Sequence, residues 1–460
     1  MGNYVSKNPA TGEVVAEFPE HSDAEINEAI EKADGAYRSW KFASLSDRAA
    51  LLQQVSKVFR DRAQELAEVI TTEMGKPITQ ALGEVEIVAR IFEYYAVNLE
   101  KFLADELIET ALAGKAFIRA EAIGVLLGIM PWNFPYYQIA RFAAPNIGLG
   151  NTILIKHARN CPRTALAFES VMREAGAPEG VYTNIFASNE QVAQMLAHDA
   201  VRAVSLTGSE RAGAAVAEAA GRNLKKCVLE LGGSDPFIVC ASADPQQAAA
   251  AAAEGRLRNA GQVCTSSKRF FAHADIYDEF VRELKQEFSE WVPSDPLSPN
   301  TKIGSLSSAT ALADVDELVQ DAVSKGATVL VAGGHCDVPE FLDGSFYQPI
   351  VLTDVTEDMR IFREEVFGPV AVLHRFETDE EAIAAANDSP YGLAAAVFTN
   401  DDAQWSKFNH RLEVGMVWRN ATSKSAPELP FGGVKNSGFG RELSRLGLDE
   451  FANKKLIAEP

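Results

Sequence analysis

Apolar residues in the N-terminal part of the chain recur with the period of an α-helix. One apolar stripe follows a potential N-cap at Ser22, and a second follows Ser46 or Asp47. The tripeptide Gly75-Lys76-Pro77 predicts the end of the second helix, because glycine and proline terminate helices, and a third helix is expected to run to about Leu103. We therefore expect three N-terminal helices, each with one face in a core.

From residue 152 onward, short apolar runs alternate with helical stretches. Strands are expected at 152–156, 182–186 and 201–206, each followed by a helix. Repeated units of this length are typical of a parallel, doubly wound sheet, whose ligands bind at the carboxyl ends of the strands. The GxGxxG fingerprint of dinucleotide-binding domains is absent, so the pattern alone leaves dinucleotide binding an open hypothesis.

A second alternation of strands and helices follows Glu230, which predicts a second α/β domain and a change of domain near Gly232. The apolar stretch from Ala116 to Met130 is expected as a strand. The strands of the second domain are expected at 236–240, 269–273, 327–331 and 370–376.

The composition narrows the class of protein. The chain has 460 residues, of which 47% are hydrophobic, and a net charge of -21, which disfavours nucleic acid or an anionic membrane as a partner. An anionic substrate would need a locally cationic pocket. The five cysteines are scattered and form no CxxC motif or Cys/His cluster, so we expect neither a disulfide framework nor a metal site, and a cytoplasmic location. No signal peptide or membrane-spanning run is recognised.

Three polar residues form a candidate catalytic set. Cys264 lies in a connection between a helical run and a strand, Glu230 ends an apolar strand before two glycines, and Asn133 stands between two prolines. They could supply a nucleophile, a general base and an oxyanion donor. Taken singly, each has a simpler interpretation: a buried cysteine, an ion-paired glutamate and a turn residue.

Taken together, these residues belong to five motifs in a fixed order: PWNFP, LELGGS, GQVC, EEVFGPV and PFGGVKNSGFGRE. In this order the motifs resemble the aldehyde dehydrogenase superfamily, and the resemblance runs from Asn8 to Phe451. It implies that the thiolate of Cys264 attacks an aldehyde, that hydride passes to a nicotinamide cofactor, and that Glu230 activates water to hydrolyse the thioester. Asn133 then stabilises the oxyanion.

The resemblance also implies an α/β fold with two doubly wound Rossmann-like domains and a small β hairpin and tail for oligomerisation. We expect a cofactor-binding domain at 1–114 and 131–231, oligomerisation strands at 115–130 and 445–460, and a catalytic domain at 232–444. A homodimer or homotetramer is expected, because exposed strand edges invite pairing.

Six residues are expected at the cofactor. By match to the family, five of them are Trp132, Lys156 near the adenosine ribose, Ser209 at a helix start that favours a pyrophosphate, Glu365 at the nicotinamide ribose, and Phe367; the sixth is Arg159. Arg159 stands where NAD-preferring relatives often have a glutamate, and a guanidinium can bind a 2′-phosphate. This favours NADP, with NAD as the alternative.

Three further residues concern the substrate. Arg141, Arg258 and Ser425 match positions that bind the substrate carboxylate in the family's succinate-semialdehyde dehydrogenases. The expected reaction is the oxidation of succinate semialdehyde to succinate. Another aldehyde, such as glutarate semialdehyde, is an alternative, and a catalytically silent binding protein on the same fold is a more remote one.

Overall fold

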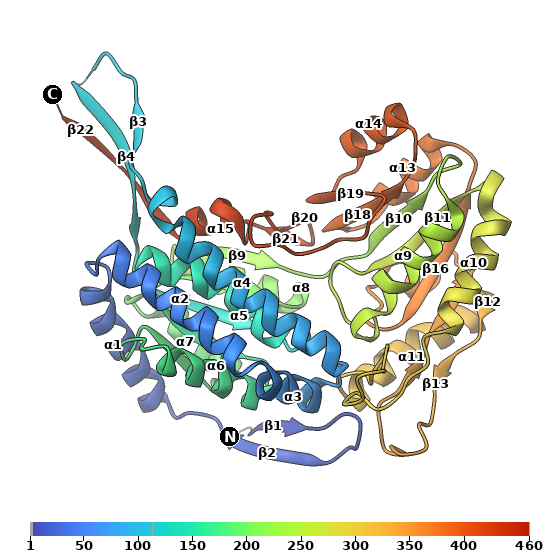
Figure 1. Cartoon of the computed structure of the whole chain (residues 1–460), viewed down its shortest axis with the longest axis horizontal. Helices are drawn as coiled ribbons and strands as arrows, with labels where there is room; N and C mark the ends of the chain where they lie inside the picture. Colours follow the sequence, from blue (N-terminus) through green and yellow to red (C-terminus); the bar gives the residue numbers. More distant parts are fainter. Residues whose placement is uncertain (1–2, 113, 460) are drawn as a thin grey trace.

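The computed structural model describes residues 3–112 and 114–459, which form two lobes and a projecting arm (Figure 1). The first lobe is built on a six-stranded sheet in the order β21-β9-β8-β5-β6-β7, parallel except for β21. Its strands are β5 (Val125–Met130), β6 (Thr152–His157), β7 (Tyr182–Ile185), β8 (Val201–Thr207), β9 (Lys226–Glu230) and β21 (Gly438–Phe439).

The second lobe is built on a seven-stranded sheet in the order β12-β15-β16-β11-β10-β18-β19, parallel except for β12. The two doubly wound sheets expected from the sequence are thus confirmed. The strands of the second sheet are β10 (Asp235–Val239), β11 (Ser267–His273), β12 (Thr328–Val331), β15 (Ile350–Thr353), β16 (Val370–Phe376), β18 (Ala394–Phe398) and β19 (Met416–Arg419).

Helices cover both sheets, and α5 is buried along its whole length in the first lobe. The helices of the first lobe are α1 (Asp23–Trp40), α2 (Leu45–Asp61), α3 (Ala63–Met74), α4 (Ile78–Phe102), α5 (Pro135–Leu149), α6 (Pro162–Glu174), α7 (Asn189–Ala197), α8 (Glu210–Arg222) and α15 (Ser444–Glu450). Those of the second are α9 (Pro245–Leu257), α10 (Tyr277–Ser289), α11 (Ala309–Ser324), α12 (Arg360–Arg363), α13 (Asp379–Asn387) and α14 (Asp402–Arg411).

The N-terminal helices show which local sequence signals were sufficient to predict where a helix begins or ends. Ser22 caps α1 in a capping box with Glu25, as expected, and Gly75 ends α3 in the left-handed conformation at φ 80°. The start of the second helix was placed too late, because the side chain that accepts from the first turn belongs to Ser44. The prediction of one continuous second helix was also wrong, since the chain leaves helical geometry at Arg62, between α2 and α3.

The arm is a three-stranded antiparallel sheet of β3 (Glu106–Ile108), β4 (Lys115–Ala122) and β22 (Ala452–Glu459), which projects from the first lobe (Figure 1). The expected single strand from Ala116 to Met130 is wrong. The chain turns at Gly124, with φ 139°, so that β4 joins the arm whereas β5 lies inside the six-stranded sheet.

The C-terminal part of the chain also returns to the first lobe. β21 pairs antiparallel with β9, which places Gly438 opposite Glu230, although residue 438 falls within the range expected for the second domain. Of the described helices, none is long and apolar enough to cross a membrane. The short remaining strands are β1 (Asn3–Lys7), β2 (Val14–Pro19), β13 (Gly334–His335), β14 (Tyr347–Gln348), β17 (Tyr391–Gly392) and β20 (Val434–Lys435).

Candidate active site

Cys264 lies in a sharply bent connection between α9 and β11. Three consecutive residues before it, Asn259, Ala260 and Gly261, have positive φ angles of 52°, 52° and 73°. A side chain at Gly261 would place its Cβ 2.3 Å from the carbonyl oxygen of Gly368, so only glycine fits there. This backbone geometry brings the thiol to the wall of a cavity of about 350 Å³.

Asn133 lies beside this connection, between β5 and α5. Its side-chain amide donates to the carbonyl oxygen of Gln262 at 3.0 Å. The backbone carbonyl oxygen of Asn133 accepts from Lys76 Nζ at 2.9 Å and from the side-chain amide of Asn259 at 3.0 Å. Lys76 is in turn ion-paired with the buried carboxylate of Glu84. The structure therefore fixes Asn133 against the turn that carries Cys264, as an oxyanion donor requires.

The thiol of Cys264 lies in a poorly solvated environment with charges of both signs. Burial raises its pKa to about 12, an effect that Arg141 and Lys268 oppose and that Glu365 and Glu230 reinforce. A change in any of these charges therefore alters the thiolate fraction of Cys264.

Glu230 ends β9 with its side chain buried. Neither carboxyl oxygen has a hydrogen-bond partner among the described residues. Burial, more than any other influence, raises the pKa of Glu230 well above its usual range, with Arg141 opposing and Glu442 adding to the shift. A buried carboxyl group without a partner is unfavourable for folding, and such groups concentrate at functional sites. Glu230 is therefore suited to accepting and releasing a proton.

The glycine-rich segment 430–440 packs directly on Glu230. A Cβ at Gly432 would lie 2.7 Å from its Oε1, and a Cβ at Gly438 would lie 2.0 Å from the carbonyl oxygen of Leu229. Ser437 also binds the chain directly after Glu230, since its hydroxyl donates to the Gly232 carbonyl oxygen at 2.7 Å. Gly438 is thus required by the close approach of two backbones, and Gly432 by the Glu230 carboxylate and the Gly440 carbonyl oxygen, which would lie 2.8 Å from its Cβ.

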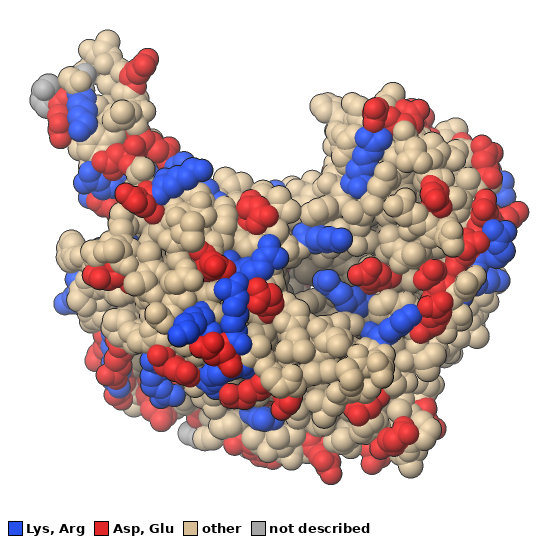
Figure 2. Space-filling model, viewed as in Figure 1, with Lys and Arg blue, Asp and Glu red and all other residues tan. Residues whose placement is uncertain are grey.

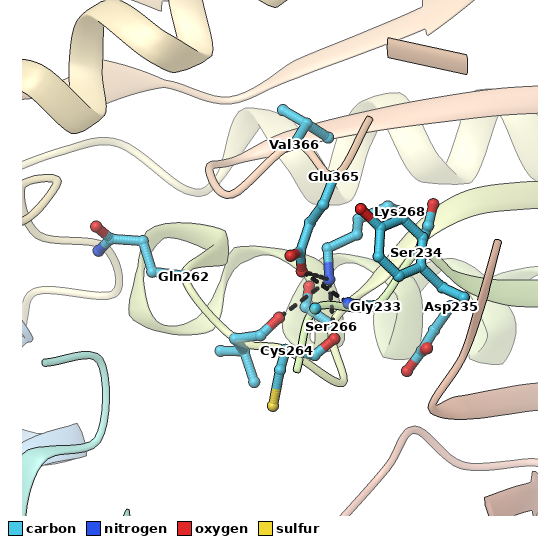
Figure 3. A network of polar contacts seen from close by, with 12 residues as sticks. Gly233, Ser234, Asp235, Gln262, Cys264, Ser266, Lys268, Glu365 and Val366 are labelled. Carbon is cyan, nitrogen blue, oxygen red and sulfur yellow. Dashed lines mark hydrogen bonds and ion pairs between the residues drawn. The ribbon is translucent and has the colours of Figure 1, made fainter. Parts of the chain in front are cut away.

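Glu365 lies on another side of Cys264, in a polar network (Figure 3). Its carboxylate is ion-paired with Lys268 at 3.0 Å and accepts from the backbone N–H of Gly233 at 3.1 Å. Phe367 packs edge-on against Trp132, with ring centroids 5.7 Å apart. The residues expected at the nicotinamide end of a dinucleotide are therefore close to the nucleophile.

Lys156 and Arg159 lie at the carboxyl end of β6, next to the ring of Tyr4. The charged groups are 5.8 and 5.3 Å from that ring centroid. Arg159 is ion-paired with Glu20, which the sequence did not indicate. Burial and the charge of Arg159 lower the pKa of Lys156 to about 8. Arg159 is therefore close to the expected 2′-phosphate position but already has an anionic partner.

Ser209 caps α8, with its hydroxyl accepting from the Ala212 N–H at 3.3 Å. The first turn of that helix follows the carboxyl end of β8, where the sequence predicted a pyrophosphate. The Lys156 ammonium has no hydrogen-bond partner among the described residues, although its side chain is only 9% exposed. A buried cation with hydrogen bonds still to offer at a strand end fits the ribose or phosphate of a dinucleotide.

The cavity beside Cys264 is lined by all three residues expected to bind the substrate. Arg141, Arg258 and Ser425 face it together with Phe134, Tyr137 and Phe431. Tyr137 donates its hydroxyl to Ser425 at 2.7 Å. Three positions distant in the sequence therefore line one cavity, and their contact with a substrate carboxylate stays a prediction.

Arg141 and Arg258 are held differently in this cavity. Arg141 is fully buried, with its Nε 2.7 Å from a carboxylate oxygen of Glu442. Arg258 has no ion-pair partner among the described residues. Solvent in the cavity reaches its side chain, although surrounding protein groups lower its pKa by desolvation. Arg258 is the cation better placed to receive an anion.

Several Lys and Arg side chains, with a few Asp and Glu among them, lie around the hollow between the lobes (Figure 2). Arg90 and Lys424 line the same cavity as Arg258 and, within the described ranges, also have no ion-pair partner. This arrangement is the locally cationic pocket that an acidic chain needs to bind an anion.

Several residues that hold the site were not predicted from the sequence. Lys76 and Glu84 support Asn133, Glu442 pairs with Arg141, and Lys268 pairs with Glu365. Glu442 and Lys268 lie within or next to recognised motifs, but their partners are distant in sequence. Within residues 3–112 and 114–459, no group of three or more His, Cys, Asp or Glu side chains could hold a metal ion.

Comparisons with known proteins confirm the resemblance seen in the motifs. The model of the aldehyde dehydrogenase family matches residues 2–457. A succinate-semialdehyde dehydrogenase [NADP(+)] from Deinococcus radiodurans is 51% identical over 99% of this chain and 94% of its own length. A probable succinate-semialdehyde dehydrogenase [NADP(+)] from Synechocystis is 41% identical over 98% of both chains.

Among solved structures, the chain is similar to the succinic semialdehyde dehydrogenase of Streptococcus pyogenes in complex with NADP+. The TM-score is 0.96 at 42% identity, covering 99% of this chain and 100% of the other. A succinate-semialdehyde dehydrogenase from Burkholderia pseudomallei has a TM-score of 0.95 at 35% identity, covering 99% and 94%. The similarity extends over both lobes and the arm.

Proposed function

The chain belongs to the aldehyde dehydrogenase family, and we propose that it oxidises succinate semialdehyde to succinate with NADP+. The observation that carries the choice of substrate is the cavity that joins the Cys264 thiol to the unpaired guanidinium of Arg258. A carboxylate held by that cation would place the aldehyde at the other end of a short chain within reach of the thiol. The names of full-length relatives support the same substrate and cofactor.

In the first half of the reaction, the thiolate of Cys264 attacks the aldehyde carbon to give a thiohemiacetal. The developing oxyanion accepts hydrogen bonds from the Asn133 amide and the Cys264 backbone N–H, and losing one such donor costs about 3 kcal/mol of transition-state stabilisation. The nicotinamide supplies an acceptor for the hydride that leaves the substrate carbon. A thioester on Cys264 remains.

In the second half, Glu230 takes a proton from water as the oxygen of that water attacks the thioester carbon. The carbon–sulfur bond then breaks, the thiolate leaves, and the product is a carboxylate. Because burial holds the pKa of Glu230 above its usual range, the carboxylate is a stronger base than an exposed glutamate. Hydrolysis of the thioester, and not transfer to another acyl acceptor, is the outcome that this base supports.

The cofactor would be held by residues from both lobes. Lys156, Arg159 and the start of α8 at Ser209 would bind the adenosine and phosphate groups. Trp132, Glu365 and Phe367 would hold the nicotinamide end. These assignments rest on the match to the family's positions and on the buried Lys156 ammonium, which has no hydrogen-bond partner among the described residues.

Steady-state kinetics test the proposal. We expect kcat/KM for succinate semialdehyde to exceed that for butyraldehyde, which has the same chain length but no carboxylate, by about 10²-fold or more. The value of kcat/KM for glutarate semialdehyde in the same assay measures how strongly the enzyme discriminates between substrates of different chain length. Equal efficiency with butyraldehyde would rule out recognition of the carboxylate, and preference for NAD+ would rule out the assigned cofactor.

The arm supports a proposal about assembly. Its exposed apolar side chains include Leu107 at 76% and Leu456 at 63% exposure, and they favour pairing with another copy of the chain. We propose a homodimer or a dimer of dimers, which light scattering on purified protein measures directly. We also propose a cytoplasmic location, since the five cysteines are free.

A further inference from the structure

Lys268 is a buried lysine in β11, four residues after Cys264. It is 1% exposed, and its Nζ lies 2.9 Å from the Cys264 carbonyl oxygen, 3.2 Å from the Val263 carbonyl oxygen and 3.0 Å from Glu365 Oε1. An ammonium group has three N–H bonds, whereas a neutral amine has two. Three acceptors around one buried nitrogen therefore fit the charged form.

These contacts tie three segments of the second lobe together (Figure 3). Lys268 comes from β11, its carbonyl partners come from the nucleophile turn, and Glu365 comes from the loop before β16. A side chain at Gly233 would come within 2.7 Å of the Cys264 carbonyl oxygen, so the turn is also packed closely from a fourth segment. The Cys264 sulfur points away from the network, which therefore holds the backbone and leaves the thiol free.

The network also affects the charge balance around the thiol. The charged groups that act on Cys264 are the cations Arg141 and Lys268 and the carboxylates Glu365 and Glu230. Lys268 pairs with one of these carboxylates, so Lys268 and Glu365 have opposing effects on the same thiol. Asp235 also interacts with Lys268, and one of its oxygens accepts from the Ala394 N–H at 3.0 Å.

We infer that Lys268 is a positioning residue that fixes the nucleophile turn through two backbone carbonyls and, balanced by Glu365, controls the reactivity of the Cys264 thiol. This inference rests on the proposed role of Cys264 as nucleophile, but it concerns the protein without substrate or cofactor. It assigns Glu365 a second role, because the carboxylate expected at the nicotinamide ribose also compensates the cation behind the nucleophile.

The rate of alkylation of Cys264 by iodoacetamide tests the inference. Peptide mass spectrometry identifies the modified cysteine, and the rate is followed from pH 7 to pH 10 in the cofactor-free enzyme. Lys268→Met removes the cation and should slow alkylation at pH 8 by about tenfold, moving the pH profile to higher pH. Glu365→Gln removes the opposing anion and should speed alkylation and move the profile to lower pH.

The opposite directions of the two expected changes in alkylation rate distinguish control by charge from a purely structural effect. If Lys268 only supports the fold, both variants loosen the same network and change the alkylation rate in the same direction, which would overturn the inference. Lys268→Arg, which keeps the charge, should preserve the wild-type pH profile. Should Lys268→Met not fold, the other two variants decide the question. Faster alkylation of Glu365→Gln with an unchanged pH profile of Lys268→Arg would support the inference, and slower alkylation of Glu365→Gln would overturn it.

A matched control is Lys302→Met, which removes an exposed lysine paired with Glu290 at 2.9 Å and should leave the profile unchanged. Alkylation requires neither an aldehyde nor NADP+. A failure of the proposed succinate semialdehyde oxidation would therefore leave the alkylation result interpretable, and a failure here would leave the proposed substrate intact.

Discussion

The two walls of the substrate cavity hold their arginines in different ways. On the wall formed by α5, Arg141 is buried, paired with Glu442 and packed between the rings of Tyr137 and Phe431, whose centroids lie 4.9 and 4.3 Å from its guanidinium carbon. On the wall that precedes the nucleophile turn, Arg258 has no ion pair within the described ranges, and solvent reaches it. The same residue type is therefore ion-paired on one wall and has no ion pair on the other, so Arg258 is the more available of the two to an anion.

The largest expected effect concerns stability on the Arg141 wall. Arg141→Met leaves the carboxylate of Glu442 buried without its partner, and we expect a loss of about 3–5 kcal/mol in the free energy of unfolding. Urea unfolding monitored by fluorescence measures it, and Arg258→Met should change stability by less than about 1 kcal/mol. A double variant with Glu442→Leu should recover part of the loss. Equal destabilisation by the two single arginine variants would abolish the contrast between the walls.

The next effect concerns catalysis on the Arg258 wall. Arg258→Met should lower kcat/KM for succinate semialdehyde by about 10²-fold, or about 3 kcal/mol, because the substrate carboxylate loses its cation. The value for butyraldehyde should stay within about twofold of the wild type. A parallel decrease for both aldehydes would mean that Arg258 supports the cavity and does not select the acid.

A third arginine extends the comparison to the cofactor end. Arg159 resembles Arg141 in being paired, since it contacts Glu20. Glu20→Gln weakens this pair and should raise kcat/KM for NADP+ by about threefold, or somewhat less than 1 kcal/mol, without changing that for NAD+. Arg159→Glu, the opposite change, should lower efficiency with NADP+ and spare NAD+. An equal response of both cofactors to Glu20→Gln would contradict a role for Arg159 at the 2′-phosphate.

A pH dependence of similar size is expected from Lys156. Lys156 has a pKa lowered to about 8, chiefly by burial and then by the charge of Arg159. Its ammonium is charged below that pH, so affinity for the anionic cofactor should decrease as the pH rises through 8, by about threefold between pH 7.5 and 8.5. Arg159→Gln removes a repelling cation and should move this decrease to higher pH. Fluorescence titration with NADPH measures both profiles, and a flat wild-type profile would contradict the assignment of Lys156.

The sequence was most informative where the chemistry depends on contiguous residues. The doubly wound sheets, the cap at Ser22 and the three-residue set of Cys264, Glu230 and Asn133 all follow from local patterns or ordered motifs. In the structure Cys264 lines the substrate cavity, Asn133 donates to Gln262 in the turn that carries Cys264, and the charge of Glu230 acts on the thiol. The split between β4 and β5 was missed because the segment 116–130 was predicted as one strand, whereas the chain turns at Gly124 between the two.

The partners of the site residues could not be predicted. Glu442 follows Arg141 in the sequence by about 300 residues, and Glu20 precedes Arg159 by 139. No periodicity or spacing rule relates residues so far apart, and a charged residue in a sequence carries no mark of whether a counter-ion faces it in the fold. Whether an arginine is free to bind a ligand is therefore a property of tertiary structure.

The pairing of β21 with β9 has a consequence for how the enzyme forms during synthesis. β9, which carries Glu230, is translated about halfway along the chain, but its outer edge is covered by Gly438 and Phe439, and Ser437 bonds to Gly232 across 205 positions of the chain. A nascent chain that has reached only the second lobe leaves this edge open to other strands. The glutamate can take its final surroundings only after residue 439 has emerged from the ribosome, so a growing polypeptide remains catalytically incomplete throughout most of translation.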